Sequence, residues 1–142
     1  MTKHDVMNQY FTDMVKEIEA STPGFNFADN REGAIGFITE YSNKIKKKYV
    51  RGAEKEYGFM CLFTQLYSSS TDDVNLQAMN KAQKIIDWLD EQELKKNYPD
   101  FGEHCQVKKI EVTQNIPELA SADWENQIAQ YAVHCKVTYF EK

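Results

Sequence analysis

Residues 57–67 read Tyr57-Gly58-Phe59-Met60-Cys61-Leu62-Phe63-Thr64-Gln65-Leu66-Tyr67. The odd positions are mostly aromatic and the even positions mostly aliphatic, so a strand formed by this segment has two apolar faces. We therefore predict a central strand over residues 56–67, with a helix packed on one of its faces. The aromatic face needs a second cover, which is either the N-terminal helix or another subunit.

Three elements are predicted upstream of this strand. Apolar residues at helical spacing predict a helix over residues 4–20, which the segment Ser21-Thr22-Pro23-Gly24 ends and which a loop follows. Residues 35–41 are rich in β-branched and aromatic residues and predict a strand. Residues 45–51 predict a further strand that forms a hairpin with residues 56–67, and Gly52 suits the turn between them.

A long helix is predicted downstream, because Thr71 or Asp72 can cap its first turn and Tyr98-Pro99 ends it. Its predicted buried stripe consists of Leu76, Met79, Ala82, Ile85, Ile86 and Leu89. Trp88 falls beside this stripe, which indicates a residue at a rim or an interface.

Two strands close the predicted fold. The first covers residues 106–113 and needs a bulge or a late start near Val107, where the alternation is out of phase. A loop over residues 114–127 then leads to a strand over residues 131–140. The fold class is therefore α+β, a largely antiparallel sheet of about five strands with an N-terminal helix and a long central helix packed on it, in one domain over residues 1–142.

Composition excludes several classes of protein. Lys and Arg number 17 and Asp and Glu number 22, so the formal charge of −5 argues against a general nucleic-acid binder. No stretch approaches the roughly 18 apolar residues that a membrane-spanning helix needs. The odd number of cysteines, without a CxxC pair or a signal peptide, predicts a reduced cytosolic protein with no disulfide.

Catalysis is not predicted, because the sequence has no phosphate-binding loop, nucleophile elbow or metalloprotease motif. The dipeptides His104-Cys105 and His134-Cys135 contain the residue types that bind zinc. Adjacent residues on a strand point to opposite faces, however, so each dipeptide offers only one ligand to a given site. We predict no catalytic residue, no cofactor and no metal, with the cysteines acting as small buried apolar residues.

The segment Lys44–Lys55 concentrates positive charge in a hairpin that projects beyond the sheet. It has two interpretations: lysines that protect a sheet edge, or an arm that contacts an acidic protein surface or a nucleic-acid backbone. The predicted interaction residues of this hairpin are Lys46, Lys47, Lys48, Tyr49 and Arg51. The predicted interface aromatics are Tyr57, Phe59, Phe63, Tyr67 and Tyr139.

Several short segments along nearly the whole chain form a recognisable set: Ile35-Gly36-Phe37, Lys48-Tyr49-Val50-Arg51-Gly52, Tyr57-Gly58-Phe59, Ser70-Thr71-Asp72, Asn75, Trp88-Leu89, Pro99, Tyr131 and Val137-Thr138-Tyr139-Phe140. Together they resemble a family of small proteins in the head–tail gene block of long-tailed bacteriophages and prophages, often described as minor capsid proteins. The segment Ser42-Asn43-Lys44-Ile45 departs from the family, because a turn containing glycine is expected there.

The family looks like the tail-terminator or tail-completion group, which shares an α+β fold and forms rings, typically hexamers, on the head-proximal end of the tail tube. The resemblance implies a virion protein without enzymatic activity. Its implied partners are copies of itself, the tail-tube protein and head–tail connector proteins, and DNA passes through the ring without specific binding. It also implies a location in the bacterial cytoplasm during assembly and then in the virion neck, with Gly52, Asp72 and the terminal strand in structural roles.

Two other classes of function remain open. The aromatic face of residues 57–67 could form the pocket of a small cytosolic enzyme or ligand-binding domain. The hairpin of residues 44–55 could serve a nucleic-acid-binding accessory protein.

Overall fold

The computed structural model describes residues 2–18, 21–25, 34–40, 42, 45–66, 72–114, 116–123 and 125–142. Its elements are α1 (Lys3–Glu17), β1 (Ser21–Phe25), β2 (Ala34–Glu40), β3 (Lys47–Tyr49), β4 (Gly52–Leu66), α2 (Asp72–Lys95), β5 (Cys105–Val112), β6 (Glu118–Asp123) and β7 (Ile128–Glu141). The predicted α+β class, with an N-terminal and a central helix, is confirmed.

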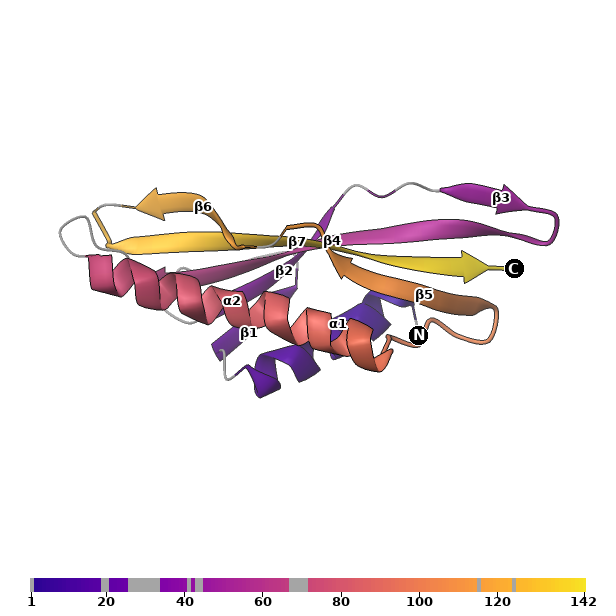
Figure 1. Ribbon diagram of the computed structural model, residues 1–142, viewed down its shortest axis with the longest axis horizontal. Coiled ribbons are helices and arrows are strands. Elements are labelled where there is room, and N and C mark those ends of the chain that lie inside the picture. The colour runs from indigo at the N-terminus through magenta and orange to yellow at the C-terminus, as the bar shows by residue number, and fades with distance from the viewer. Residues whose placement is uncertain are drawn as a thin grey trace.

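The strands form one seven-stranded sheet with β4 and β7 at its centre (Figure 1). The order is β1-β2-β4-β7-β5, while β3 also pairs with β4 and β6 also pairs with β7. Among the described strands, only the pairing of β1 with β2 is parallel. The sheet is thus largely antiparallel as predicted, with two strands beyond the five that were expected.

The two additional strands are β1 and β6. Residues 21–25 were predicted to end the first helix and begin a loop, yet they form an edge strand parallel to β2, with an irregular register between Ser21 and Pro23. Proline has no backbone N–H group to donate to a neighbouring strand. An edge strand tolerates it, because one side of such a strand has no neighbour. The predicted loop over residues 114–127 is also wrong, since β6 lies within it and pairs with β7 despite having no β-branched residue.

The hairpin of β3 and β4 is tighter than predicted. Val50 and Arg51 form its turn, and Gly52 is already the first residue of β4. A Cβ atom on Gly52 would lie 2.6 Å from the carbonyl oxygen of Glu141 and 2.6 Å from the ring of Phe140. Glycine is therefore favoured here both by the close approach of β4 to β7 and by the positive φ of Gly52, 157°.

The irregularity predicted in the strand of residues 106–113 is confirmed. The pairing of β5 with β7 shifts between Val107 and Lys109, which accounts for the break in the apolar alternation.

Both helices pack on the same face of the sheet, so the described residues form two layers (Figure 1). The odd-numbered residues of β4 and β7 face the helices, and among them Cys61, Val133 and Val137 are fully buried. α1 begins at Lys3 because Thr2 and Asp5 form a capping box. Neither helix covers the opposite face, which we call the helix-free face.

Two predictions about α2 are corrected. Leu76 was expected in the buried stripe but is 60% exposed, because it lies near the start of the helix, away from the main core. Trp88 was expected at a rim or an interface but is buried against α1, where its ring meets that of Tyr10 edge-on at 5.2 Å. Its Nε1 donates a hydrogen bond of 2.5 Å to Glu17, which joins the two helices.

Candidate interaction surface

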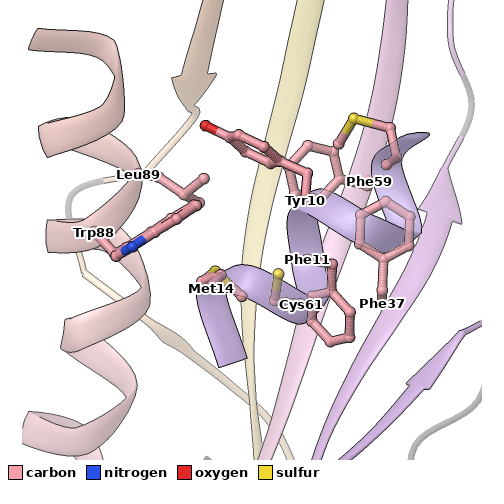
Figure 2. Close-up of a pocket in the computed structure, with 9 residues that line it drawn as sticks. Tyr10, Phe11, Met14, Phe37, Phe59, Cys61, Trp88 and Leu89 are labelled. Atoms are coloured by element: carbon pink, nitrogen blue, oxygen red, sulfur yellow. The ribbon is translucent and has the colours of Figure 1, made fainter. Parts of the chain in front are cut away.

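The space between the helices and the sheet is too small for a ligand. The cavity at this position measures only about 10 Å³, the space of one water molecule. Its walls are apolar and aromatic side chains from α1, α2, β2 and β4, which point toward one another in Figure 2. The aromatic side chains of the strands thus fill the core and leave no pocket at this place.

The predicted interface aromatics are part of this core. Tyr57, Phe59, Phe63 and Tyr139 are all buried, because α1 and α2 cover the face on which they lie. The prediction that they contact a second subunit is therefore corrected: their own chain already removes them from solvent. Tyr67 lies outside the described residues.

The two His-Cys dipeptides do not converge. His134 lies on the helix-free face, while Cys135 is buried beneath the helices, as expected for neighbours on a strand. His104 is exposed in the turn before β5, and the thiol of Cys105 donates a hydrogen bond of 3.2 Å to Glu141. Within the part of the chain that the structure describes, no group of three or more His, Cys, Asp or Glu side chains could hold a metal ion.

The thiols are poorly suited to nucleophilic chemistry. Cys61 and Cys135 are buried, and burial raises the pKa of Cys61 to about 12 and that of Cys135 well above its usual range. Burial and the neighbouring Glu141 carboxylate also raise the pKa of Cys105. Because the thiolate is the reactive form, the raised pKa values keep these thiols in the unreactive state at neutral pH.

The helix-free face of the sheet combines apolar and charged side chains. Ile38, Met60 and Leu62 are half-buried there without any described helix above them. His134 lies beside them, with Nδ1 2.8 Å from Glu40 and Nε2 3.3 Å from Glu118. A sheet face with an apolar centre and a polar surround is typical of a surface that binds another protein.

Lys136 extends the charged part of this face. Its Nζ lies 3.1 Å from Glu56 and 3.4 Å from Glu111. Histidine and lysine on this face are therefore each held between two carboxylates of the same subunit.

The basic hairpin, which we define as residues 45–53, stands out at one end of the molecule (Figure 1). Its predicted interaction residues Lys46, Lys47, Lys48, Tyr49 and Arg51 are all exposed. Val50, at the turn, is completely exposed. Tyr49 is 42% exposed and meets Phe140 edge-on at 5.6 Å, so an aromatic pair anchors the hairpin to β7.

The acidic end, which we define as residues 116–123 and 125–128, lies at the opposite end of the long axis (Figure 1). Exposed Leu119 and Ile116 accompany the carboxylates of Glu118, Asp123 and Glu125. A shallow hollow of about 450 Å³ lies here, lined by Ser121, Ala122, Asp123, Asn126, Ile128 and Gln130. The sequence did not indicate this surface, because residues 114–127 lack the alternation of a strand and were predicted to form a loop.

The root of the hairpin is tied to α1 by an ion cluster. Glu141 lies 2.9 Å from the amine of Lys3 and 2.5 Å from that of Lys55. Hydrogen bonds from Lys55 first and Lys3 second lower the pKa of Glu141 to about 2. The cluster therefore keeps its charges at neutral pH and fixes the end of β7 against the first turn of α1.

No protein-family model matches this chain, and no curated protein is significantly similar to it. No helix within the described ranges is long and apolar enough to cross a membrane.

Proposed function

We propose that this protein is a non-enzymatic assembly protein, which acts by binding copies of itself and other structural proteins. The observation that carries the proposal is the basic hairpin, which projects from the sheet and presents a fully exposed valine between cationic side chains. Covering an exposed apolar tip with a partner removes it from water and favours association. The helix-free face of the sheet adds a second surface with an apolar centre.

The particular assembly that we propose is the neck of a long-tailed bacteriophage, where the protein acts as a tail terminator or tail-completion protein. The resemblance of the sequence to that group supports this proposal, and the two-layer α+β fold agrees with the fold that the resemblance implies. The net charge of −5 is also compatible with a ring through which DNA passes, because an acidic surface repels the phosphate backbone.

The partners in this proposal are other copies of the chain, arranged as a ring of the hexameric type, the tail-tube protein and the head–tail connector proteins. The protein acts in the bacterial cytoplasm during assembly and remains in the virion neck. It uses no cofactor.

Co-assembly with the cognate tail-tube protein tests this function. Tubes polymerised in the presence of the protein should carry it at one end and should be shorter than tubes polymerised alone, and electron microscopy measures both properties. An unrelated acidic protein of similar size is the control. Tubes with bare ends and unchanged lengths, together with normally joined tails in virions from a gene deletion, would contradict the proposal.

A further inference from the structure

The two ends of the long axis carry opposite charges. Residues 45–53 contain three lysines and one arginine and no acidic residue, whereas residues 112–135 contain three acidic residues and no lysine or arginine. The first segment forms the basic hairpin, and the second contains β6 and the acidic end, at the other end of the molecule (Figure 1). One subunit therefore presents both halves of a complementary pair of surfaces.

We propose that the basic hairpin of one copy docks onto the acidic end of the next copy, head to tail. This inference rests on the self-association in the proposed function and assigns it to two named surfaces. Opposite charges across an interface attract the partners and fix their orientation. Because the two surfaces differ, the contact is heterologous, and it closes into a ring if the rotation between subunits allows.

The basic hairpin and the acidic end also match in shape and in apolar character. Val50 forms an exposed apolar tip on the hairpin, and the hollow at the acidic end has Ile128 and Asp123 in its lining. A valine that enters such a hollow is removed from water, while neighbouring cations meet carboxylates around it.

Contacts between like surfaces fit the charges less well. Two hairpins facing each other would bring together two sets of the same cations, Lys46, Lys47, Lys48 and Arg51, which repel one another. On the helix-free face, Lys136 already contacts Glu56 and Glu111 of its own subunit, and His134 contacts Glu40 as well as Glu118 of the acidic end. The acidic end therefore offers the hairpin the better electrostatic partner.

Charge reversal at each surface tests the contact. The hairpin variant Lys48→Glu/Arg51→Glu and the acidic-end variant Glu118→Lys/Glu125→Lys change exposed side chains only. Sedimentation velocity at about 20 mM salt should show concentration-dependent association of the wild type, which weakens at about 500 mM salt. Each variant should lower the association constant by about tenfold or more.

Mixing the two variants distinguishes a head-to-tail contact from a symmetric one. The acidic-end variant retains a normal hairpin, and the hairpin variant retains a normal acidic end. Neutral versions are mixed, Lys48→Ser/Arg51→Ser with Glu118→Gln/Glu125→Gln, because two reversed surfaces would attract each other. Their mixture should form a one-to-one dimer that grows no further, because only one charged contact remains. Association lost in the hairpin variant alone would instead indicate a symmetric contact or a contact elsewhere, and would overturn the proposal.

Two control variants change the net charge by the same amounts at other places. Lys81→Glu/Lys84→Glu matches the hairpin variant, and Asp90→Lys/Glu103→Lys matches the acidic-end variant, because all four side chains are exposed. Both controls should associate like the wild type. If they weaken association equally, then overall charge, and not the proposed contact, controls self-association.

Cross-linking detects the contact even where it is weak. In a Cys105→Ser background, Val50→Cys protein mixed with Asn126→Cys protein should form a mixed disulfide under mild oxidation, whereas a mixture of Val50→Cys with Lys84→Cys should not. The absence of both the mixed disulfide and salt-sensitive association would overturn the inference. The capping of tail tubes is a separate measurement. If both charge variants still cap the tubes, the contact between hairpin and acidic end is refuted, but the tail-terminator function is not.

Discussion

Gly52 and Glu141 lie at the end of the central strand pair, and they approach so closely that no side chain fits between them. A Cβ atom on Gly52 would lie 2.6 Å from the carbonyl oxygen of Glu141, a backbone atom that cannot move without shifting β7. The hairpin is thereby attached to the last residues of the sheet.

Substituting this glycine should destabilise the protein. We expect Gly52→Ala to lower the free energy of unfolding by about 1–3 kcal/mol, because the new methyl group forces the strands apart. Gly102→Ala is the matched control, since Gly102 also has a positive φ, of 109°, but a Cβ atom added there would meet no other atom within 4 Å. Urea denaturation measures both effects. Equal losses in the two variants would show that backbone strain, and not the close approach, sets the requirement for glycine.

Acid should weaken the ion cluster around Glu141. The pKa of this carboxyl group is lowered to about 2, by Lys55 first and Lys3 second, from an ordinary value of 4.5. A lowered pKa in the folded state means that the stabilisation is complete above about pH 4.5 and is lost as the pH falls toward 2. Glu141→Gln should therefore lower the free energy of unfolding by about 1 kcal/mol at pH 7 and by almost nothing at pH 2. The figure at pH 7 is reduced because the carboxylate is partly exposed to solvent.

Thermal denaturation of the wild type and Glu141→Gln across this pH range measures the difference. Glu103→Gln, an exposed acidic residue in the turn before β5, is the control. A difference in stability that stayed constant from pH 7 to pH 2 would exclude the ionised carboxylate as its source.

Removing the charge of the basic hairpin should leave the fold intact. The free energy of unfolding of the triple variant Lys46→Ser/Lys47→Ser/Lys48→Ser should lie within about 0.5 kcal/mol of the wild-type value, because all three side chains are exposed. Leu62 is only half-buried on the helix-free face, so the fully buried Ile85 is the better comparison. Ile85→Ala should lower the free energy of unfolding by about 2–5 kcal/mol. A loss of similar size in the triple variant would show that the hairpin is packed.

The same triple variant tests the nucleic-acid alternative. Binding of the wild type to duplex DNA that falls steeply with salt, and disappears in the triple variant, would favour a nucleic-acid-binding hairpin over the assembly function.

Zinc should be absent from the purified protein. Elemental analysis is expected to give far less than one zinc ion per chain, because the dipeptides at 104–105 and 134–135 present their side chains in different places. Stoichiometric zinc that disappears in a Cys105→Ala/Cys135→Ala double variant would contradict this prediction.

The central part of the fold could be predicted because its residues alternate strongly. β4 and β7 carry aromatic and β-branched residues on one face, and this pattern indicates a strand from the sequence alone. β1 and β6 lack such a pattern, since Pro23 interrupts the first and small or acidic residues dominate the second. Their strand structure comes from pairing with a neighbour, which a local pattern does not contain.

The candidate site was predicted only in part, for a related reason. A cluster of lysines in the sequence indicates exposure, so the hairpin residues were identified correctly as a charged surface. Periodicity also showed that both faces of β4 are apolar, but it could not tell which face the helices cover. The acidic end could not be predicted, because it depends on the register of β6 against β7, and this register is set by the tertiary structure.

The pairing of β4 with β7 should also delay the completion of the sheet during folding. Residues 53–66 pair with residues 128–141, so each contact joins positions far apart in the sequence. Such long-range pairing is slow to form, because the intervening chain must first be closed into a loop. A growing chain cannot complete its central sheet before Glu141 has been synthesised. Until then β4 has a free edge, and a chaperone that shields this edge would raise the yield of folded protein.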